Sequence, residues 1–251
     1  REQQGGALEG GRHLAQDEDG FFFQMVEVAL VDRGGQLLQR DSGIHAWAPD
    51  FSFNASINFT KLNNKLVSLG NGQNQHIQGN TITKAGNSVG MWYVLQTDGL
   101  FQNQQEIQNY VNSAGTVIMP NAQPGDIRFK DINDDGEITN EDKDIVSSPW
   151  PEFEMGFNAG ASYKGFDFSM NWIASHGATV YNGFRSVVDR FDDNSNYRAG
   201  IQPWTPENPN TDFPRVTKGS TLNSRGDSDR FLESGDFIRL KYIGFGYNLP
   251  K

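Results

Sequence analysis

The chain has 251 residues, of which 36% are hydrophobic and 21% charged, so it is long enough for one large or two ordinary domains. Its 31 acidic and 21 basic residues give a formal net charge of -10, without a lysine or arginine cluster that could follow a nucleic-acid backbone. The absence of cysteine excludes disulfide bonds, thiolate metal sites and cysteine nucleophiles. Because the net charge is negative and no basic cluster is present, we expect no nucleic-acid partner.

No segment is long and apolar enough to form a membrane helix. The richest one, residues 21–31, is interrupted by Gln24 and Glu27 and falls short of the roughly 18 apolar residues that a spanning helix needs. This excludes a helical membrane protein but not a β-barrel, whose alternating strands are hydrophilic on average. The chain begins with Arg1 and shows no charged-then-apolar leader, so a signal peptide is either absent or removed.

Strict period-two alternation predicts three long strands. Residues 51–59 put only apolar side chains on one face and only Ser or Asn on the other. The same pattern occupies residues 153–163 and, with Ile173 as its exception, residues 166–174. Lys164 and Gly165, which separate these two segments, predict a hairpin turn in which the glycine supplies a positive φ.

A fourth β-prone segment and three long polar stretches complete the pattern. Residues 237–249 predict a strand whose phase slips near Ile243, as a β-bulge would produce. The stretches rich in Gly, Pro and Asn cover residues 64–90, 98–126 and 176–230. Loops of this length are rare in compact domains, whereas outer-membrane barrels carry long loops on one side.

Two architectures produce strands of this kind, a soluble β-sandwich and a membrane β-barrel. Strands of nine to eleven residues at about 3.4 Å per residue, tilted near 40°, span roughly the 25 Å apolar height of an outer-membrane barrel. Their polar faces carry small Ser, Asn and Gly residues, and aromatic residues stand at both ends of the apolar faces, as interface girdles do. The pattern favours the barrel slightly and leaves the sandwich open.

The segment DINDDGEITNED (131–142) has the spacing of a calcium-binding loop. Gly136 would reverse the chain so that oxygen atoms surround one point, and Thr139 would add an oxygen or a water. Because an aspartate ends the loop where an EF-hand has glutamate, and a strand enters it, we predict a structural Ca²⁺ site, not a switch. The predicted ligands are the side chains of Asp131, Asn133, Asp135 and Asp142 and the backbone carbonyl of Glu137.

Other interpretations of these polar residues remain open. The same loop can be an Asx-rich turn without metal, in which Thr139 caps a short helix. Glu152 and Glu154 share a strand face, but nothing else converges on them, so no catalytic residue is proposed and no enzyme is expected. Aromatic residues in the long stretches, such as Phe101 and Trp204, pack within the loops or stack on a ligand.

Several long motifs together resemble the C-terminal barrel half of SusC/RagA-type TonB-dependent outer-membrane transporters. The resemblance covers about residues 50–251 and is supported further by residues 51–70 and 90–107. The motifs are GDIRFKDINDDG (125–136), PWPEFEMGF (149–157), YKGFDFS (163–169), WTPENPNTDFPR (204–215) and SDRFLESGDFIRLKYIGFGYNLPK (228–251). Such transporters have a 22-stranded barrel, an N-terminal plug, a TonB-contacting segment and a SusD-like lipoprotein lid.

The sequence departs from the family pattern at both ends. Residues 1–48 show no period-two segment able to cross a membrane, and we treat them as unassigned, either out-of-family or a wrong-frame translation. Residues 49–251 are assigned to a partial TonB-dependent receptor β-barrel. The plug and TonB-contacting segment are not found, and the chain stops at Lys251, where the family continues through further strands.

The resemblance implies an all-β fold, a partial transmembrane antiparallel β-barrel with long extracellular loops. It implies a place in the bacterial outer membrane, in contact with lipid, and import of an oligosaccharide or peptide with a SusD-like surface lipoprotein and with TonB, which binds through a region absent from this chain. The alternative is a secreted, calcium-stabilised β-sandwich that binds carbohydrate. Five side chains distinguish the two, because they face lipid in a barrel and a second sheet in a sandwich: Phe53, Ile57, Phe157, Phe168 and Met170.

Overall fold

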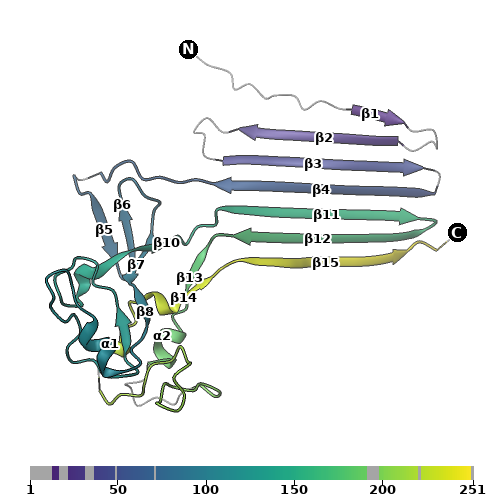
Figure 1. Ribbon diagram of the computed structural model, residues 1–251. Helices are drawn as coiled ribbons and strands as arrows, with labels where there is room; N and C mark the ends of the chain where they lie inside the picture. The colour runs from purple at the N-terminus through teal and green to yellow at the C-terminus, as the bar shows by residue number, and fades with distance from the viewer. Residues whose placement is uncertain are drawn as a thin grey trace. The chain divides into compact units, whose positions relative to one another are not determined.

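The computed structural model describes residues 13–16, 22–31, 37–48, 50–70, 72–190, 198–219 and 222–249 (Figure 1). The chain forms two compact units. The sheet unit comprises Arg1–Lys65, Trp150–Thr179 and Ser234–Lys251, and the insert unit comprises Leu66–Pro149 and Val180–Glu233. Among the described residues, no helix has the length and apolar character needed to span a bilayer.

The sheet unit is one seven-stranded antiparallel sheet in the order β1-β2-β3-β4-β11-β12-β15 (Figure 1). Four of its strands correspond to the predicted segments 51–59, 153–163, 166–174 and 237–249, and each has eleven or twelve residues. The strands are β1 (His13–Gln16), β2 (Phe22–Val31), β3 (Leu37–Ala48), β4 (Phe51–Leu62), β11 (Phe153–Tyr163), β12 (Phe166–His176) and β15 (Phe237–Tyr247).

The structure contains strands within residues 1–48, where the sequence shows no period-two segment able to cross a membrane. The backbones of β2 and β3 continue the sheet from the outer edge of β4 with an unbroken register. Period-two analysis misses β2 because its sequence, FFQMVEVALV, has apolar residues at both odd and even positions. The wrong-frame hypothesis and the boundary near residue 48 stay predictions, and residues 1–12 lie outside the described residues.

The register of β12 and β15 contains the predicted bulge. Asn171 pairs with Tyr242 while Trp172 pairs with Leu240, so Lys241 is the extra residue on β15. A single inserted residue moves the following side chains to the opposite face, which explains why the apolar phase slips in this segment. The bulge therefore keeps apolar residues on one face along the whole of β15.

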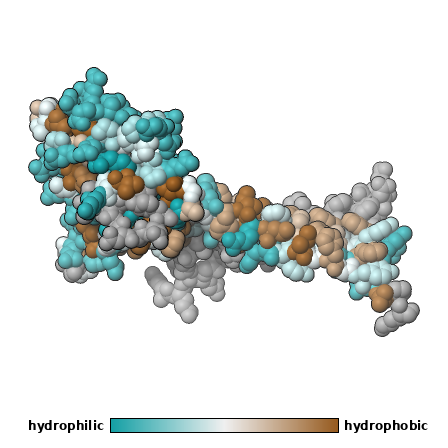
Figure 2. Space-filling model, turned by 90° about the horizontal axis from the view of Figure 1, so that it is seen from below, coloured by the Kyte–Doolittle hydropathy of each residue, from teal (hydrophilic) through white to brown (hydrophobic). Residues whose placement is uncertain are grey.

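One face of the sheet unit is apolar and exposed. Phe53, Ile57 and Phe157 keep 37%, 44% and 37% of their surface accessible, and Phe168 and Met170 are only half-buried. Brown hydrophobic side chains lie open along the sheet unit in the space-filling view (Figure 2). In the described part of the chain, this face is not a sandwich core, and its exposure is what a lipid-facing surface requires.

Aromatic residues form a continuous row at one end of this face. Tyr163 is paired with Phe51 on one side and Phe166 on the other, and Phe166 is paired with Tyr247. The rings of Phe166 and Tyr247 lie 4.5 Å apart. Phe51, Tyr163 and Tyr247 are far apart in the sequence, but strand register aligns them as the aromatic girdle of a membrane barrel is aligned.

The opposite face is polar, and its glycines make room for side chains of the next strand. A Cβ atom on Gly156 would lie 2.5 Å from Asn58 Oδ1, and one on Gly160 would collide with Asn54. Asn158 donates to Ser56 Oγ at 3.3 Å and accepts a hydrogen bond from Asn171. The small residues therefore allow asparagine side chains to lie along the sheet instead of standing away from it.

The insert unit contains the described hydrophobic core, so the long polar stretches are folded and not structureless loops. A four-stranded sheet has the order β10-β7-β6-β5, and two-stranded sheets pair β8 with β9 and β13 with β14. The buried cluster consists of Leu95, Phe101, Ile107, Ile118, Met119, Ile127 and Phe129. The elements are β5 (Gln75–Gln78), β6 (Thr81–Lys84), β7 (Met91–Leu95), β8 (Thr97–Leu100), α1 (Gln104–Asn109), β9 (Ile127–Phe129), β10 (Lys143–Ser147), β13 (Thr179–Tyr181), α2 (Arg185–Val188) and β14 (Leu232–Ser234).

Strand register puts both long insertions at the same end of the sheet. Phe153, at the start of β11, pairs with Lys61 near the end of β4 and with His176 at the end of β12. Phe237, which begins β15, pairs with Ser175. Two-residue turns join β3 to β4 and β11 to β12 at the opposite end. Long connections at one end and tight turns at the other are typical of an outer-membrane barrel.

The β11–β12 hairpin turn gives a first prediction. Lys164 has φ 47° and Gly165 has φ 87°, as in a two-residue turn whose central residues are both left-handed. Gly165→Ala should lower the free energy of unfolding by about 1–2 kcal/mol because a Cβ atom is unfavourable at this φ. Gly183→Ala, where the nearest atom to an added Cβ is 3.9 Å away, is the control. Equal urea midpoints for the two variants would contradict the prediction.

Candidate functional site

The predicted calcium loop connects β9 to β10 and is closed by its own hydrogen bonds. Asp131 accepts from the backbone N–H groups of Asp135 at 3.2 Å and Gly136 at 2.8 Å. Asn133 Oδ1 accepts from Asp135 N at 3.1 Å, and Asp135 Oδ1 accepts from Glu137 N at 2.9 Å. Gly136 has φ 90°, so the predicted chain reversal at this glycine is confirmed.

Asp142 closes the loop from its far end. Its side chain is fully buried, its Oδ1 accepts from Ile132 N at 2.9 Å, and its Oδ2 accepts from Thr139 N at 2.7 Å. Thr139 and Asp142 form a complete capping box on the 3-10 turn Asn140–Asp142. The capping expected in the metal-free interpretation is therefore confirmed, and Asp142 fixes the first and last residues of the loop to each other.

The donor set suits a hard cation, since it consists of carboxylate, amide and carbonyl oxygens. In the described residues, however, no three His, Asp or Glu side chains converge closely enough to hold a metal ion. Several of the predicted ligand oxygens instead accept backbone N–H groups. Calcium binding by Asp131, Asn133, Asp135, Glu137 and Asp142 stays a prediction.

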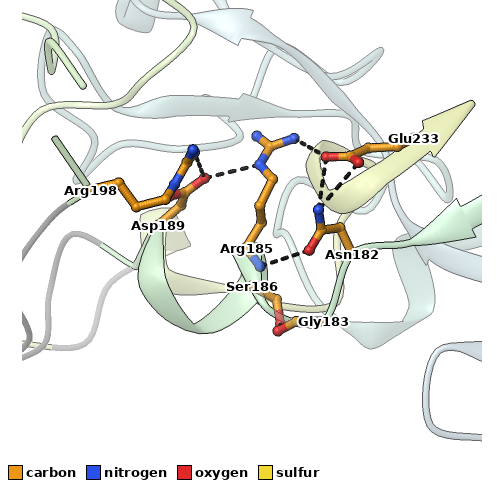
Figure 3. A network of polar contacts seen from close by, with 7 residues as sticks. All are labelled: Asn182, Gly183, Arg185, Ser186, Asp189, Arg198 and Glu233. Atoms are coloured by element: carbon orange, nitrogen blue, oxygen red, sulfur yellow. Dashed lines mark hydrogen bonds and ion pairs between the residues drawn. The ribbon is translucent and has the colours of Figure 1, made fainter. Parts of the chain in front are cut away.

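A second group of polar residues lies in the insert unit around the buried carboxylate of Asp189 (Figure 3). Asp189 accepts hydrogen bonds from Arg198 Nε and Nη2, both at 2.7 Å, and from Arg185 Nε at 3.0 Å. Arg185 Nη1 also donates to Glu233 at 2.7 Å, and Asn182 Nδ2 donates to the same carboxylate at 3.1 Å. This network joins α2 to β14.

Charge pairing keeps the central carboxylate of this network ionised. Burial raises the pKa of Asp189, but the hydrogen bonds from Arg198 and Arg185 outweigh burial, so the pKa lies below the ordinary value. The members of the network are distributed over residues 182–233 without a motif, so no pattern in the sequence predicts it. Their only signal in the sequence is the presence of charged residues within otherwise polar stretches.

The two loop aromatics named in the sequence analysis lie inside the insert unit. Phe101 is fully buried and Trp204 is 9% exposed, so these loop aromatics pack instead of offering a stacking surface. His176 Nδ1 lies 2.7 Å from Asp236 Oδ2 at the end of β12. The backbone N–H of Glu152 donates to the His176 carbonyl at 2.8 Å. Neither glutamate of the strand pair belongs to a described cluster of acidic or histidine residues suited to metal.

Removal of the Asp142 side chain should destabilise the insert unit. Asp142→Ala leaves the partly buried N–H groups of Ile132 and Thr139 without their acceptor, which should cost about 1–3 kcal/mol of unfolding free energy. Glu141→Ala, at the exposed neighbouring position, is the matched control. Urea denaturation measures both, and a loss below about 0.5 kcal/mol for Asp142→Ala would argue against the role given to this carboxylate.

Calcium titration tests the loop directly. If the loop binds Ca²⁺, calorimetry of the folded protein should show calcium-dependent heat, and Asp131→Ala and Asp135→Ala should each weaken binding at least tenfold by removing a ligand. Asp144→Asn, which changes an exposed carboxylate just beyond the loop, should bind as the parent does. Absence of heat and of calcium-dependent stabilisation in the parent would eliminate the metal interpretation.

Relatives of known type match most of this chain. The TonB-dependent receptor P3 of Formosa agariphila is 30% identical over 212 residues, which cover 80% of this chain and 20% of that receptor. The TonB-dependent receptor P26 of the same organism is 27% identical over 242 residues, 93% of this chain and 24% of the receptor. The TonB-dependent receptor SusC of Bacteroides thetaiotaomicron is 27% identical over 205 residues, 79% of this chain and 19% of the receptor. No family model matches the chain.

Solved structures agree on the fold. A chain of the RagAB peptide transporter matches with a TM-score of 0.61 and 17% identity, over 92% of this chain and 26% of its own length. The closed-closed state of the RagAB peptide importer matches with a TM-score of 0.59. This chain therefore spans about a fifth to a quarter of the length of its curated relatives. The motifs, the sheet and these similarities together assign the chain to the SusC/RagA-type TonB-dependent receptors, of which it represents a part.

Proposed function

We propose that the sheet unit forms part of the barrel wall of a TonB-dependent transporter in the bacterial outer membrane. The observation that carries the proposal is the two-sided sheet of eleven- and twelve-residue strands, apolar and exposed on one face and lined with small polar residues on the other. Such a sheet is stable when lipid covers the first face and water fills the lumen against the second.

We infer the orientation from the connections. The two insertions that build the insert unit leave from one end of the sheet, and tight turns occupy the other. Outer-membrane barrels have short periplasmic turns and long extracellular loops. The insert unit is thus assigned to the cell exterior and the β11–β12 hairpin to the periplasm.

We further propose that the transporter imports an oligosaccharide or a peptide. Its partner is a SusD-like surface lipoprotein, and TonB is its energy source. Support comes from the similarity to the receptor named SusC and to a chain of the RagAB peptide transporter. The relatives are receptors and transporters, and no enzymatic role is proposed. Co-purification of a lipoprotein with the tagged protein, and uptake of labelled oligosaccharides and peptides by cells with and without the gene, test these parts separately.

Charge on the apolar face tests the membrane assignment. Phe157→Arg should cost about 2–4 kcal/mol near the middle of a bilayer, so the variant should be depleted from the outer membrane and unfold at lower urea. Ser169→Arg puts the same side chain on the polar face, where register aligns Ser169 with Gly160 and Gly244, and should assemble normally. The measurement is membrane fractionation followed by urea unfolding.

The soluble β-sandwich predicts another result. In a sandwich the wild-type protein would fractionate with soluble material, and Phe157→Arg would disrupt a core between two sheets. A wild-type protein that remains soluble and monomeric without detergent or lipid would therefore overturn the outer-membrane proposal.

A further inference from the structure

A cavity of about 400 Å³ lies in the insert unit beside the network around Asp189. Its walls combine apolar residues with hydroxyl and guanidinium groups and with the exposed carboxylate of Asp212. Ligand sites commonly have such a mixture of apolar walls and a few polar groups. The lining residues with a part in the argument are Thr97, Leu100, Ile127, Arg185, Phe213 and Arg230. All of them belong to the insert unit.

Arg230 is the unusual member of this lining. Its Nη1 atom is buried and has no hydrogen-bond partner among the residues that the structure describes. Burial, together with the nearby positive charge of Arg185, lowers the pKa of Arg230 to about 10. Buried polar groups in proteins are almost always paired, so an unpaired guanidinium nitrogen on a residue that lines a cavity indicates that this arginine lacks an acceptor there.

The neighbouring carboxylates do not supply this acceptor. Asp189 is occupied by Arg185 and Arg198, and Asp229 accepts hydrogen bonds from the backbone N–H and the hydroxyl of Thr97 at 3.1 and 2.7 Å. Asp212 lines the cavity but is exposed. Within the described parts of the insert unit, Arg230 has no ion pair with any of the three.

Arg185 provides a second guanidinium at the same cavity, and its position is fixed. Its Nε and Nη1 atoms bind Asp189 and Glu233, which hold the side chain from two sides (Figure 3). Side chains that are held in this way lose little additional freedom when a ligand binds, so a preorganised site can gain affinity. The network around Asp189 therefore holds Arg185 in place at the cavity wall.

We propose that this cavity binds a carboxylate group of a ligand, with Arg230 as its direct hydrogen-bond donor and Arg185 as the adjacent positive charge. A planar carboxylate matches the fork of a guanidinium group. A dianionic phosphate fits less well because the carboxylates of Asp212 and Asp229 lie nearby. Leu100, Ile127 and Phe213 then contact the apolar body that carries the carboxylate.

This inference deepens the proposed function, since a ligand on the cell-exterior side of a transporter is cargo. A carboxylate can come from the end or an acidic side chain of a peptide, or from an acidic sugar. The binding test uses purified protein and requires no uptake. Its failure is therefore distinguishable from failure of the outer-membrane proposal, which the Phe157→Arg fractionation addresses.

Calorimetry on the full-length protein in detergent compares matched ligand pairs. The probes are N-acetyl-leucine against N-acetyl-leucinamide, and glucuronate against glucose. The carboxylate member of at least one pair should bind about tenfold more tightly, as a charge-assisted hydrogen bond provides. A preference within the first pair assigns the cargo to peptides, and one within the second assigns it to acidic sugars. Equal binding within both pairs would overturn the proposal.

Substitutions identify the donor. Arg230→Met should abolish the carboxylate preference, Arg230→Lys should reduce it in part, and Arg239→Met, which changes an arginine of β15 in the sheet unit, should preserve it. Arg230→Met should also leave the Tm of the ligand-free protein unchanged or raise it, because the replaced nitrogen has no partner to lose. Retention of the full preference in Arg230→Met would overturn the assignment of the donor.

Discussion

The hydrogen-bonded register of the antiparallel strands is the constraint on which the rest of the structure depends. Side chains alternate between faces with a period of two, so register alone decides which residues share a face. It aligns the apolar residues of β4, β11, β12 and β15 into one surface and their small polar residues into another. The bulge at Lys241 illustrates this constraint. One additional residue shifts the register, so that the apolar residues on both sides of the bulge lie on the same face of the sheet.

The two units are stabilised in different ways. The insert unit buries its own apolar cluster around Phe101 and Phe129, and ion pairs such as that between Arg215 and Asp126 accompany it. The sheet unit has little buried apolar surface among the described residues and leaves its large side chains open. Backbone hydrogen bonds hold its strands together. A soluble sheet buries its apolar face against a second layer, whereas in the proposed barrel lipid covers this face.

The acidic loop and the arginine-lined cavity differ in how their charged groups are paired. In the acidic loop, backbone N–H groups donate to the carboxylates of Asp131 and Asp142 and hold the loop closed. At the cavity, the network around Asp189 satisfies Arg185 but not Arg230. An unpaired donor costs free energy in the unliganded protein, and in a binding protein such a cost is recovered when the ligand arrives.

Sequence by itself determined the long strands, the hairpin at Gly165, the chain reversal at Gly136 and the family resemblance. These features depend on alternation, turn chemistry and motif spacing, which are local properties. Tertiary structure alone decided that β2 and β3 extend the sheet, since β2 is apolar on both faces and β3 is polar on both faces in its middle, so that neither has a clear period-two signal. It also decided that residues of the polar stretches form a core and that Arg230 lines a cavity with its Nη1 atom unpaired among the described residues. Those outcomes depend on contacts between residues far apart in the chain, such as Asn182 with Glu233, and no local pattern encodes them.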